Sequence, residues 1–160
     1  MKKRESGFTL IELLIVIAII GILAAIAIPN LLNAVQRGKQ KRTMSDIRTM
    51  ATAVEAYAVD NNFYPPGQCT GKFTGPTTAL EANSGLSLLS PTYIANPVRR
   101  DGWSNLLQYG LTSNNQEYAF RSLGRDGSTT AATCITTTNF NDDIIYANGG
   151  FLQWPEGSQN

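Results

Sequence analysis

The sequence predicts an α+β protein in which one long N-terminal helix packs on a small antiparallel β-sheet. Three observations lead to this fold class. Residues 8–28 form a nearly unbroken apolar run, and residues 31–58 continue it with apolar side chains at three- and four-residue steps. From Asp101 onward, short runs of strand-forming residues alternate with turn residues.

The apolar run, residues 8–28, consists almost entirely of Leu, Ile, Val and Ala. A hydrocarbon core about 30 Å thick needs roughly 20 such residues in a helix. A buried helix of a soluble domain would not be apolar on all sides. A cleaved secretory signal usually has an apolar region of only about 7 to 15 residues, followed by a small-x-small cleavage site. The run therefore predicts a membrane-spanning helix.

Glu12 is the one ionisable residue in this run. A carboxylate inside a membrane helix costs on the order of 2 to 3 kcal/mol and usually has a partner. No Lys or Arg lies within the run to serve as one. The sequence leaves three alternatives: Glu12 pairs with a group outside this chain, stays neutral, or extends to the membrane interface.

Residues 29–62 are predicted to continue the helix as an amphipathic second half. Pro29 removes one backbone hydrogen bond, so we expect the helix to bend or open there. Apolar side chains then recur on one face, while Arg48 and Glu55 lie on the other. Asn61 and Asn62 followed by a Pro-Pro pair end the helix.

Residues 63–160 are predicted to form a globular head of loops and β-sheet. Residues 67–79 are rich in Gly, Thr and Pro and indicate a surface loop. A short helical turn is expected within residues 80–89, with Leu86, Leu88 and Leu89 as its buried anchors.

Two hairpins are expected in the head. The first joins residues 106–111 to 117–122, and the second joins residues 144–146 to 151–154 through an Asn-Gly-Gly turn. Residues 128–138 are Thr- and Ala-rich and predict either an edge strand or an irregular loop.

Composition and charge exclude several classes of function. The formal net charge is +1, which gives no overall field for binding nucleic acid. The chain has no histidine, and neither a nucleophile–base pair nor a phosphate-binding loop is present, so we do not expect an enzyme. Positive charges instead gather at residues 2–4, which would stay in the cytoplasm, and at residues 37–48, which could face lipid headgroups or other subunits.

The two cysteines, Cys69 and Cys134, both lie in the part expected to be outside the cytoplasm. An even number of cysteines in such a compartment favours a disulfide over two buried free thiols.

The N-terminus resembles the class III leader of type IV pilins and type II secretion pseudopilins. The resemblance rests on a short basic segment, a Gly-Phe step and a glutamate four residues after the phenylalanine, here Gly7, Phe8 and Glu12. It implies that a prepilin peptidase removes residues 1–7 and methylates the new amine of Phe8. It also implies that residues 8–28 pack in a filament core, where Glu12 pairs with the N-terminal amine of a neighbouring subunit.

The head is similar, more weakly, to the G-type major pseudopilins. The shared residues include Trp103, Asn105 and the pairs Asp126-Gly127 and Asp143-Ile144. The chain departs from that pattern where Gly102 replaces the usual proline, in residues 128–134, and in an additional segment, residues 145–160.

The resemblance also implies a calcium ion held by loop aspartates, here Asp126 with Asp142 or Asp143. Calcium prefers six to eight oxygen ligands, which two converging loops could supply. The alternative is that these aspartates are ordinary turn residues.

We therefore expect a structural subunit of a pilin-like filament, most like the major pseudopilin of a type II secretion system. The alternatives are the major pilin of a surface type IV pilus, for adhesion or motility, and a membrane-anchored domain that never polymerises. The resemblance implies further copies of the chain, minor pilins or pseudopilins, and an inner-membrane assembly platform as partners. It implies a single-pass bacterial inner-membrane protein, with its C-terminal domain outside the cytoplasm, that enters a periplasmic or surface filament.

Overall fold

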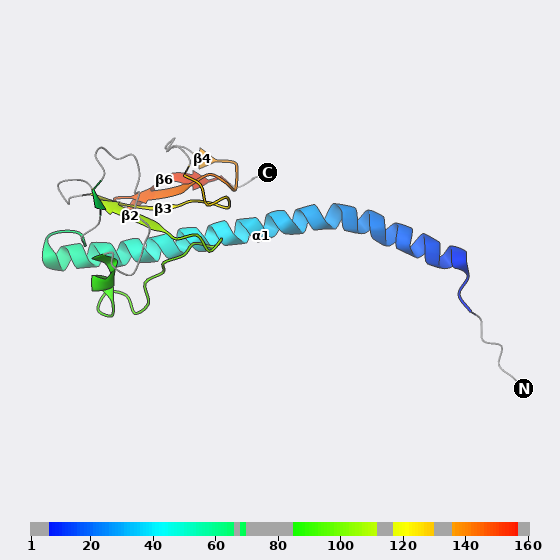
Figure 1. Cartoon of the computed structure of the whole chain (residues 1–160), viewed down its shortest axis with the longest axis horizontal. Helices are drawn as coiled ribbons and strands as arrows, with labels where there is room; N and C mark the ends of the chain where they lie inside the picture. Colours follow the sequence, from blue (N-terminus) through cyan, green and yellow to red (C-terminus); the bar gives the residue numbers. More distant parts are fainter. Residues whose placement is uncertain (1–6, 66–67, 70–84, 112–116, 130–135, 157–160) are drawn as a thin grey trace, which may run out of the picture. The chain divides into compact units, whose positions relative to one another are not determined.

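The computed structural model describes residues 7–65, 85–111, 117–129 and 136–156, together with the short strand at residues 68–69. The chain forms two compact units, Met1–Val35 and Gln36–Asn160. One helix, α1, begins at Leu10 and ends at Asn61, and so contributes to both units (Figure 1). The long helix predicted from the sequence is confirmed.

Pro29 lies inside α1, and the helix continues through it without interruption. The first unit is this part of α1 and the residues before it. Its large apolar side chains, from Phe8 to Val35, are all exposed. Because exposing these apolar side chains to water is unfavourable, we expect lipid or other protein chains to cover this surface.

The second half of α1 is amphipathic, as predicted. Ile47, Met50 and Val54 recur at helical spacing and are fully buried, whereas Thr49 and Thr52 are exposed on the opposite face. Arg48 and Glu55, which were expected on that face, instead flank the buried stripe, since Arg48 lies over the Phe151 ring and Glu55 accepts from Tyr118. Burial along the helix begins at Gln40 and Thr43. The head therefore covers one face of α1 from about residue 40 onward.

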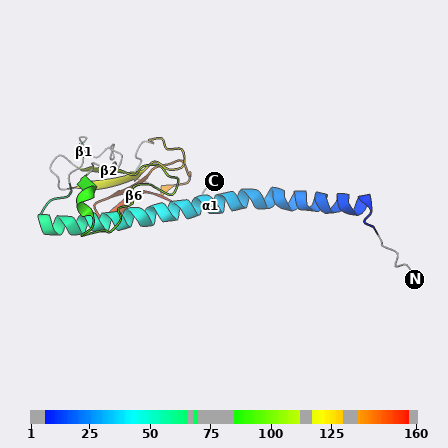
Figure 2. The same cartoon turned by 60° about the horizontal axis from the view of Figure 1, so that its bottom comes forward.

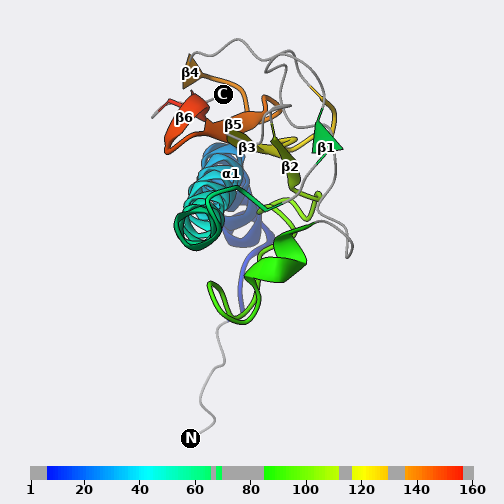
Figure 3. The same cartoon turned by 90° about the vertical axis from the view of Figure 1, so that its left-hand side faces the viewer.

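The head contains a six-stranded sheet with the order β1-β2-β3-β5-β6-β4 (Figure 3). Its strands are β1 (Gln68–Cys69), β2 (Gln108–Leu111), β3 (Tyr118–Ser122), β4 (Thr136–Thr137), β5 (Ile144–Ala147) and β6 (Gly150–Pro155). The four central strands pair antiparallel, as predicted. The two edge pairs, β1 with β2 and β4 with β6, are parallel, so the sheet is mixed. Neither edge pair is joined by a tight turn, which would have imposed the antiparallel direction.

Both predicted hairpins are present. In the second, Ala147 pairs with Gly150, so Asn148 and Gly149 form a two-residue loop. Both have positive φ, 47° and 88°, which is the geometry of a type I′ turn and explains the Asn-Gly sequence.

The helical turn expected within residues 80–89 is the 3₁₀ helix η1 (Gly85–Leu89). Leu86 and Leu89 are buried as predicted, but Leu88 is half exposed, which corrects its assignment as an anchor. A 3₁₀ helix has three residues per turn, so residues 86 and 89 share a face that residue 88 cannot join.

The hydrophobic core lies between the second half of α1 and the sheet (Figure 2). Tyr118 and Phe120 of β3 are fully buried and meet edge to face with ring centroids 6.0 Å apart, and Tyr109 of β2 lies 5.0 Å from Phe120. Such contacts add to the large apolar area that each ring buries. The three aromatic residues of the first hairpin are therefore core residues.

The predicted disulfide lies outside the described residues at Cys134. Cys69 is in β1, and β1 and β4 form opposite edges of the sheet. The bond stays a prediction. We expect thiol labelling of the denatured, unreduced protein to find no free cysteine, and reduction to lower the free energy of unfolding by about 4 kcal/mol, because the bond would close a long loop. Two labelled thiols would contradict it.

Candidate functional site

The N-terminal segment of the described chain is open to its surroundings. A Cβ atom at Gly7 would meet nothing within 4 Å. Phe8 is 86% exposed. The Gly7–Phe8 peptide bond, at which the sequence predicts cleavage, therefore lies in an exposed stretch of the described chain.

Glu12 has a local partner that the sequence analysis missed. The backbone N–H of Thr9 donates to Glu12 Oε2 at 2.8 Å, and the Thr9 hydroxyl donates to the same oxygen at 2.7 Å. The Glu12 backbone N–H in turn lies 3.3 Å from Thr9 Oγ1. This is a capping box, in which a threonine and a glutamate three residues apart satisfy each other's backbone N–H groups at a helix start. The Thr-x-x-Glu spacing was the signal that could have revealed it.

Both hydrogen bonds from Thr9 end on one carboxylate oxygen, Oε2. Glu12 is therefore held at the first turn of α1 by a contact inside its own chain. Glu12 is exposed, so an ammonium group of another chain could approach its carboxylate. The capping box and an intermolecular ion pair are thus compatible roles for the same side chain.

The surface around Glu12 is apolar and exposed. Phe8, Leu10 and Ile11 are each more than 60% exposed, and the exposed apolar series extends to Leu31, Leu32 and Val35. By length and composition, α1 is the one helix among the described residues that could cross a membrane. This part of the chain can be covered by lipid or by the same helix in other subunits.

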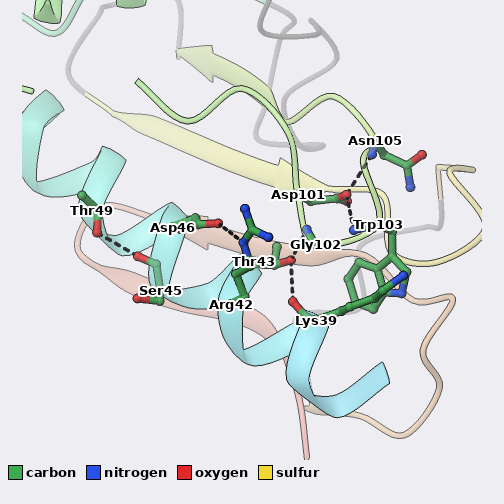
Figure 4. A network of polar contacts seen from close by, with 10 residues as sticks. All are labelled: Lys39, Arg42, Thr43, Ser45, Asp46, Thr49, Asp101, Gly102, Trp103 and Asn105. Carbon is green, nitrogen blue, oxygen red and sulfur yellow. Dashed lines mark hydrogen bonds and ion pairs between the residues drawn. The ribbon is translucent and has the colours of Figure 1, made fainter. Parts of the chain in front are cut away.

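In the second unit, a loop at residues 101–105 is built around Asp101. Asp101 Oδ1 accepts hydrogen bonds from the backbone N–H groups of Trp103 and Asn105, both at 2.9 Å (Figure 4). Its other oxygen, Oδ2, accepts from the Ser122 hydroxyl at 2.7 Å. Burial raises the pKa of the Asp101 carboxyl, and the hydrogen bonds that it accepts oppose this in part. The loop is therefore fixed by one buried carboxyl group.

This loop is anchored on α1. The Gly102 N–H donates to Thr43 Oγ1 at 2.8 Å, and Trp103 Nε1 donates to Gln36 Oε1 at 2.6 Å. A Cβ atom at Gly102 would lie 2.5 Å from the Lys39 carbonyl oxygen. Proline at this position would bring a ring and lose the donor. The departure from the G-type pattern at Gly102 thus has a structural reason.

We expect Gly102→Ala to lower the free energy of unfolding by about 1 to 3 kcal/mol, because the added methyl group overpacks the contact with the Lys39 backbone. The matched control is Gly38→Ala in α1, the helix that carries Lys39, where an added Cβ meets nothing within 4 Å. That control should stabilise the helix by roughly 0.5 to 1 kcal/mol. Thermal unfolding followed by circular dichroism measures both, and equal effects of the two changes would contradict the close approach.

The loops predicted to hold calcium do converge. The Arg125 N–H donates to the Phe140 carbonyl at 2.9 Å, and Arg125 Nε donates to Asn141 Oδ1 at 2.8 Å. Of the predicted ligands, Asp143 is fully buried and its Oδ2 lies 3.0 Å from Arg121 Nε.

The other two predicted ligands lie differently. Asp126 is exposed and accepts the Ser128 N–H at 3.0 Å, and Asp142 is partly buried. Within the described ranges, no three acidic, cysteine or histidine side chains are grouped so as to hold a metal ion. The three aspartates thus do not form one carboxylate cluster, and Asp143 already pairs with a guanidinium.

Calcium binding stays a prediction with a direct test. If the ion is bound, a chelator should lower the melting temperature of the protein, and calcium should restore it while magnesium should not, because magnesium demands a smaller octahedral shell. Asp126→Ala should abolish this response. A melting curve that the chelator does not change would contradict calcium binding. Asp126 and Asp142 would then be ordinary turn residues, and Asp143 would act only as the partner of Arg121.

Two family models match the chain. Residues 2–28 match the prokaryotic N-terminal methylation motif, and residues 30–137 match type II secretion system protein G. A type II secretion system core protein G of Aeromonas hydrophila is 33% identical, covering 88% of this chain and 97% of the relative. The same-named protein of Pectobacterium carotovorum is 40% identical over 78% of each. The type IV major fimbrial protein FimA of Dichelobacter nodosus is 35% identical over 84% of this chain and 92% of its own length.

Proposed function

The chain belongs to the type II secretion system protein G family, and we propose that it is the major pseudopilin of such a system, a structural subunit that polymerises into a filament. The observation that carries the proposal is an exposed apolar helix that begins shortly after the Gly7-Phe8 step and has a carboxylate, Glu12, in its first turn. An apolar surface of this length is stable in two environments, a bilayer and a bundle of identical helices.

The processing step is part of this proposal. A prepilin peptidase removes residues 1–7 and methylates the amine of Phe8, as the match of residues 2–28 to the methylation motif supports. Cleavage creates a new N-terminal ammonium group four residues before Glu12. Mass spectrometry of the assembled protein should then find methylated Phe8 as the first residue. Assembled subunits that retain Met1 would overturn this step.

Before assembly the subunit is anchored in the inner membrane by α1, with the head outside the cytoplasm. The match of residues 2–28 to the methylation motif supports this orientation, because the basic leader is the segment that the resemblance to pseudopilins places in the cytoplasm. The partners are further copies of the chain, the peptidase, minor pseudopilins and an inner-membrane assembly platform. Protease added to spheroplasts should digest the head, and full protection of the head would contradict the orientation.

A second candidate function is the major pilin of a surface type IV pilus. The similarity to the fimbrial protein FimA over most of both chains supports it. Deleting the gene in the source bacterium distinguishes the two. A secretion pseudopilin predicts that folded proteins accumulate in the periplasm while surface filaments, viewed by electron microscopy, are unchanged. A pilin predicts loss of the surface filaments with normal secretion. Loss of neither would favour an anchored domain that does not polymerise.

A further inference from the structure

A cluster of cations follows the exposed apolar part of α1. Residues 36–45 contain Arg37, Lys39, Lys41 and Arg42 and no acidic residue. Lys39 is partly buried and its backbone contacts Gly102. The other three, Arg37, Lys41 and Arg42, are exposed, and we call them the basic collar. Arg37 and Lys41 lie one turn apart on the same face of the helix.

We propose that the basic collar binds the anionic phosphate headgroups of the outer leaflet of the inner membrane while the subunit awaits assembly. The proposal rests on the membrane-anchored state of the proposed function, but not on filament formation.

Helix length places the collar at the membrane surface. With a rise of 1.5 Å per residue, Arg37 lies about 40 Å along the helix from Leu10, where α1 begins. A bilayer with its headgroup layers is about 40 to 45 Å thick. If Leu10 lies at the cytoplasmic edge, Arg37 reaches the opposite headgroup layer. Lys41 and Arg42 lie within about 8 Å beyond Arg37 along the helix. Their long, flexible side chains can extend over that distance toward the headgroups.

Position along the helix favours lipid over a second copy of the chain as the occupant, because the collar lies within reach of the headgroup layer. Three acidic side chains of α1 are engaged within the subunit: Asp46 lies 3.5 Å from Arg42, Glu55 accepts from Tyr118, and Asp60 accepts from Tyr93. Asp126 and Glu156 of the head are exposed, so a second copy of the chain is the competing occupant, and a direct measurement of lipid association distinguishes the two. Arg37 and Lys41 are exposed to phosphate groups, whose attraction adds roughly fivefold in association for each nearby cation.

The collar differs from a basic residue further along the same helix. The Arg48 guanidinium lies 5.1 Å from the centre of the Phe151 ring and so packs against the head. It also lies about 16 Å beyond Arg37 along the helix, past the reach of the headgroups. Arg48 is therefore a natural control.

The test uses the full chain reconstituted in phosphatidylcholine vesicles with spin-labelled phosphatidylglycerol or spin-labelled phosphatidylcholine. Electron spin resonance gives the relative association of the two lipids with the protein. We expect phosphatidylglycerol to be favoured several-fold at low salt, with the preference falling as salt screens the charges. Arg37→Gln combined with Lys41→Gln should remove most of it. The control pair is Arg48→Gln with Arg99→Gln, where Arg99 is an exposed residue between η1 and β2. It changes the net charge equally and should retain the preference.

Three results would overturn the proposal. The first is an unchanged preference in the collar variant. The second is an equal loss in the control pair, which would show a response to net charge alone. A third variant, with Lys2, Lys3 and Arg4 all changed to Gln, measures the leader, and a preference that disappears with the leader alone would also count against the collar. Matching melting curves of all variants check that the head stays folded. None of these outcomes depends on processing or assembly, so the proposed function is tested separately.

Discussion

Glu12→Gln is expected to abolish filament incorporation while the subunit still enters the membrane. In the assembled filament the amine of Phe8 would face an uncharged amide, and removing one partner of a buried ion pair costs about 3 to 5 kcal/mol. That cost corresponds to a loss of more than about a hundredfold in the equilibrium for adding a subunit. An immunoblot that compares the amount of the subunit in sheared filament fractions and in membrane fractions measures this loss of incorporation.

The substitution to Gln separates the two roles of this side chain. Gln serves in a capping box as well as Glu, so the first turn of α1 keeps its hydrogen bonds to Thr9. Thr9→Val is the complementary change, because it removes the cap hydroxyl and leaves the carboxylate. We expect filaments from Thr9→Val at moderately reduced yield. The reverse pattern, normal assembly of Glu12→Gln and none of Thr9→Val, would show that Glu12 acts by capping the helix.

Arg121→Met is expected to lower the free energy of unfolding of the head by about 3 to 5 kcal/mol. Arg121 in β3 is 2% exposed and lies 3.0 Å from Asp143 Oδ2, and Asp143 is fully buried. Without the guanidinium, a buried carboxylate loses the positive charge that offsets its desolvation. Chemical denaturation followed by fluorescence gives the change in free energy.

The double variant Arg121→Met with Asp143→Leu tests the cause. Replacing both members of a buried ion pair by apolar groups often restores stability, so the double variant should be more stable than Arg121→Met alone. Arg42→Met is the control, since the Arg42–Asp46 pair lies at the surface and should contribute at most about 1 kcal/mol. A double variant no more stable than the single one would mean that other contacts of Arg121 dominate.

The elements that repeat locally in the sequence could be predicted. The apolar periodicity along α1 predicts the buried face formed by Ile47, Met50 and Val54. The Asn148-Gly149 step predicts a type I′ turn. In each case the cause lies within a few neighbouring residues. The same holds for the N-terminal motif around Glu12.

Features that depend on distant residues could not be predicted in this way. The parallel edge strands, the pairing of Arg121 with Asp143 and the anchoring of Trp103 on Gln36 each join residues from separate elements. The spacing of residues along the sequence does not show which distant group will lie beside a buried charge. The Thr9 cap is different, because its Thr-x-x-Glu spacing is local and can be predicted from the sequence.

The contact between Gly102 and α1 has an evolutionary consequence. The Gly102 N–H needs the Thr43 hydroxyl, and its missing side chain admits the Lys39 backbone, so the two segments constrain each other's substitutions. A mutation to proline here would be harmful alone, and so would be tolerated only after the helix or the loop had already shifted. A family member with proline at this place would be separated from this chain by an epistatic barrier, which predicts that positions 43 and 102 covary.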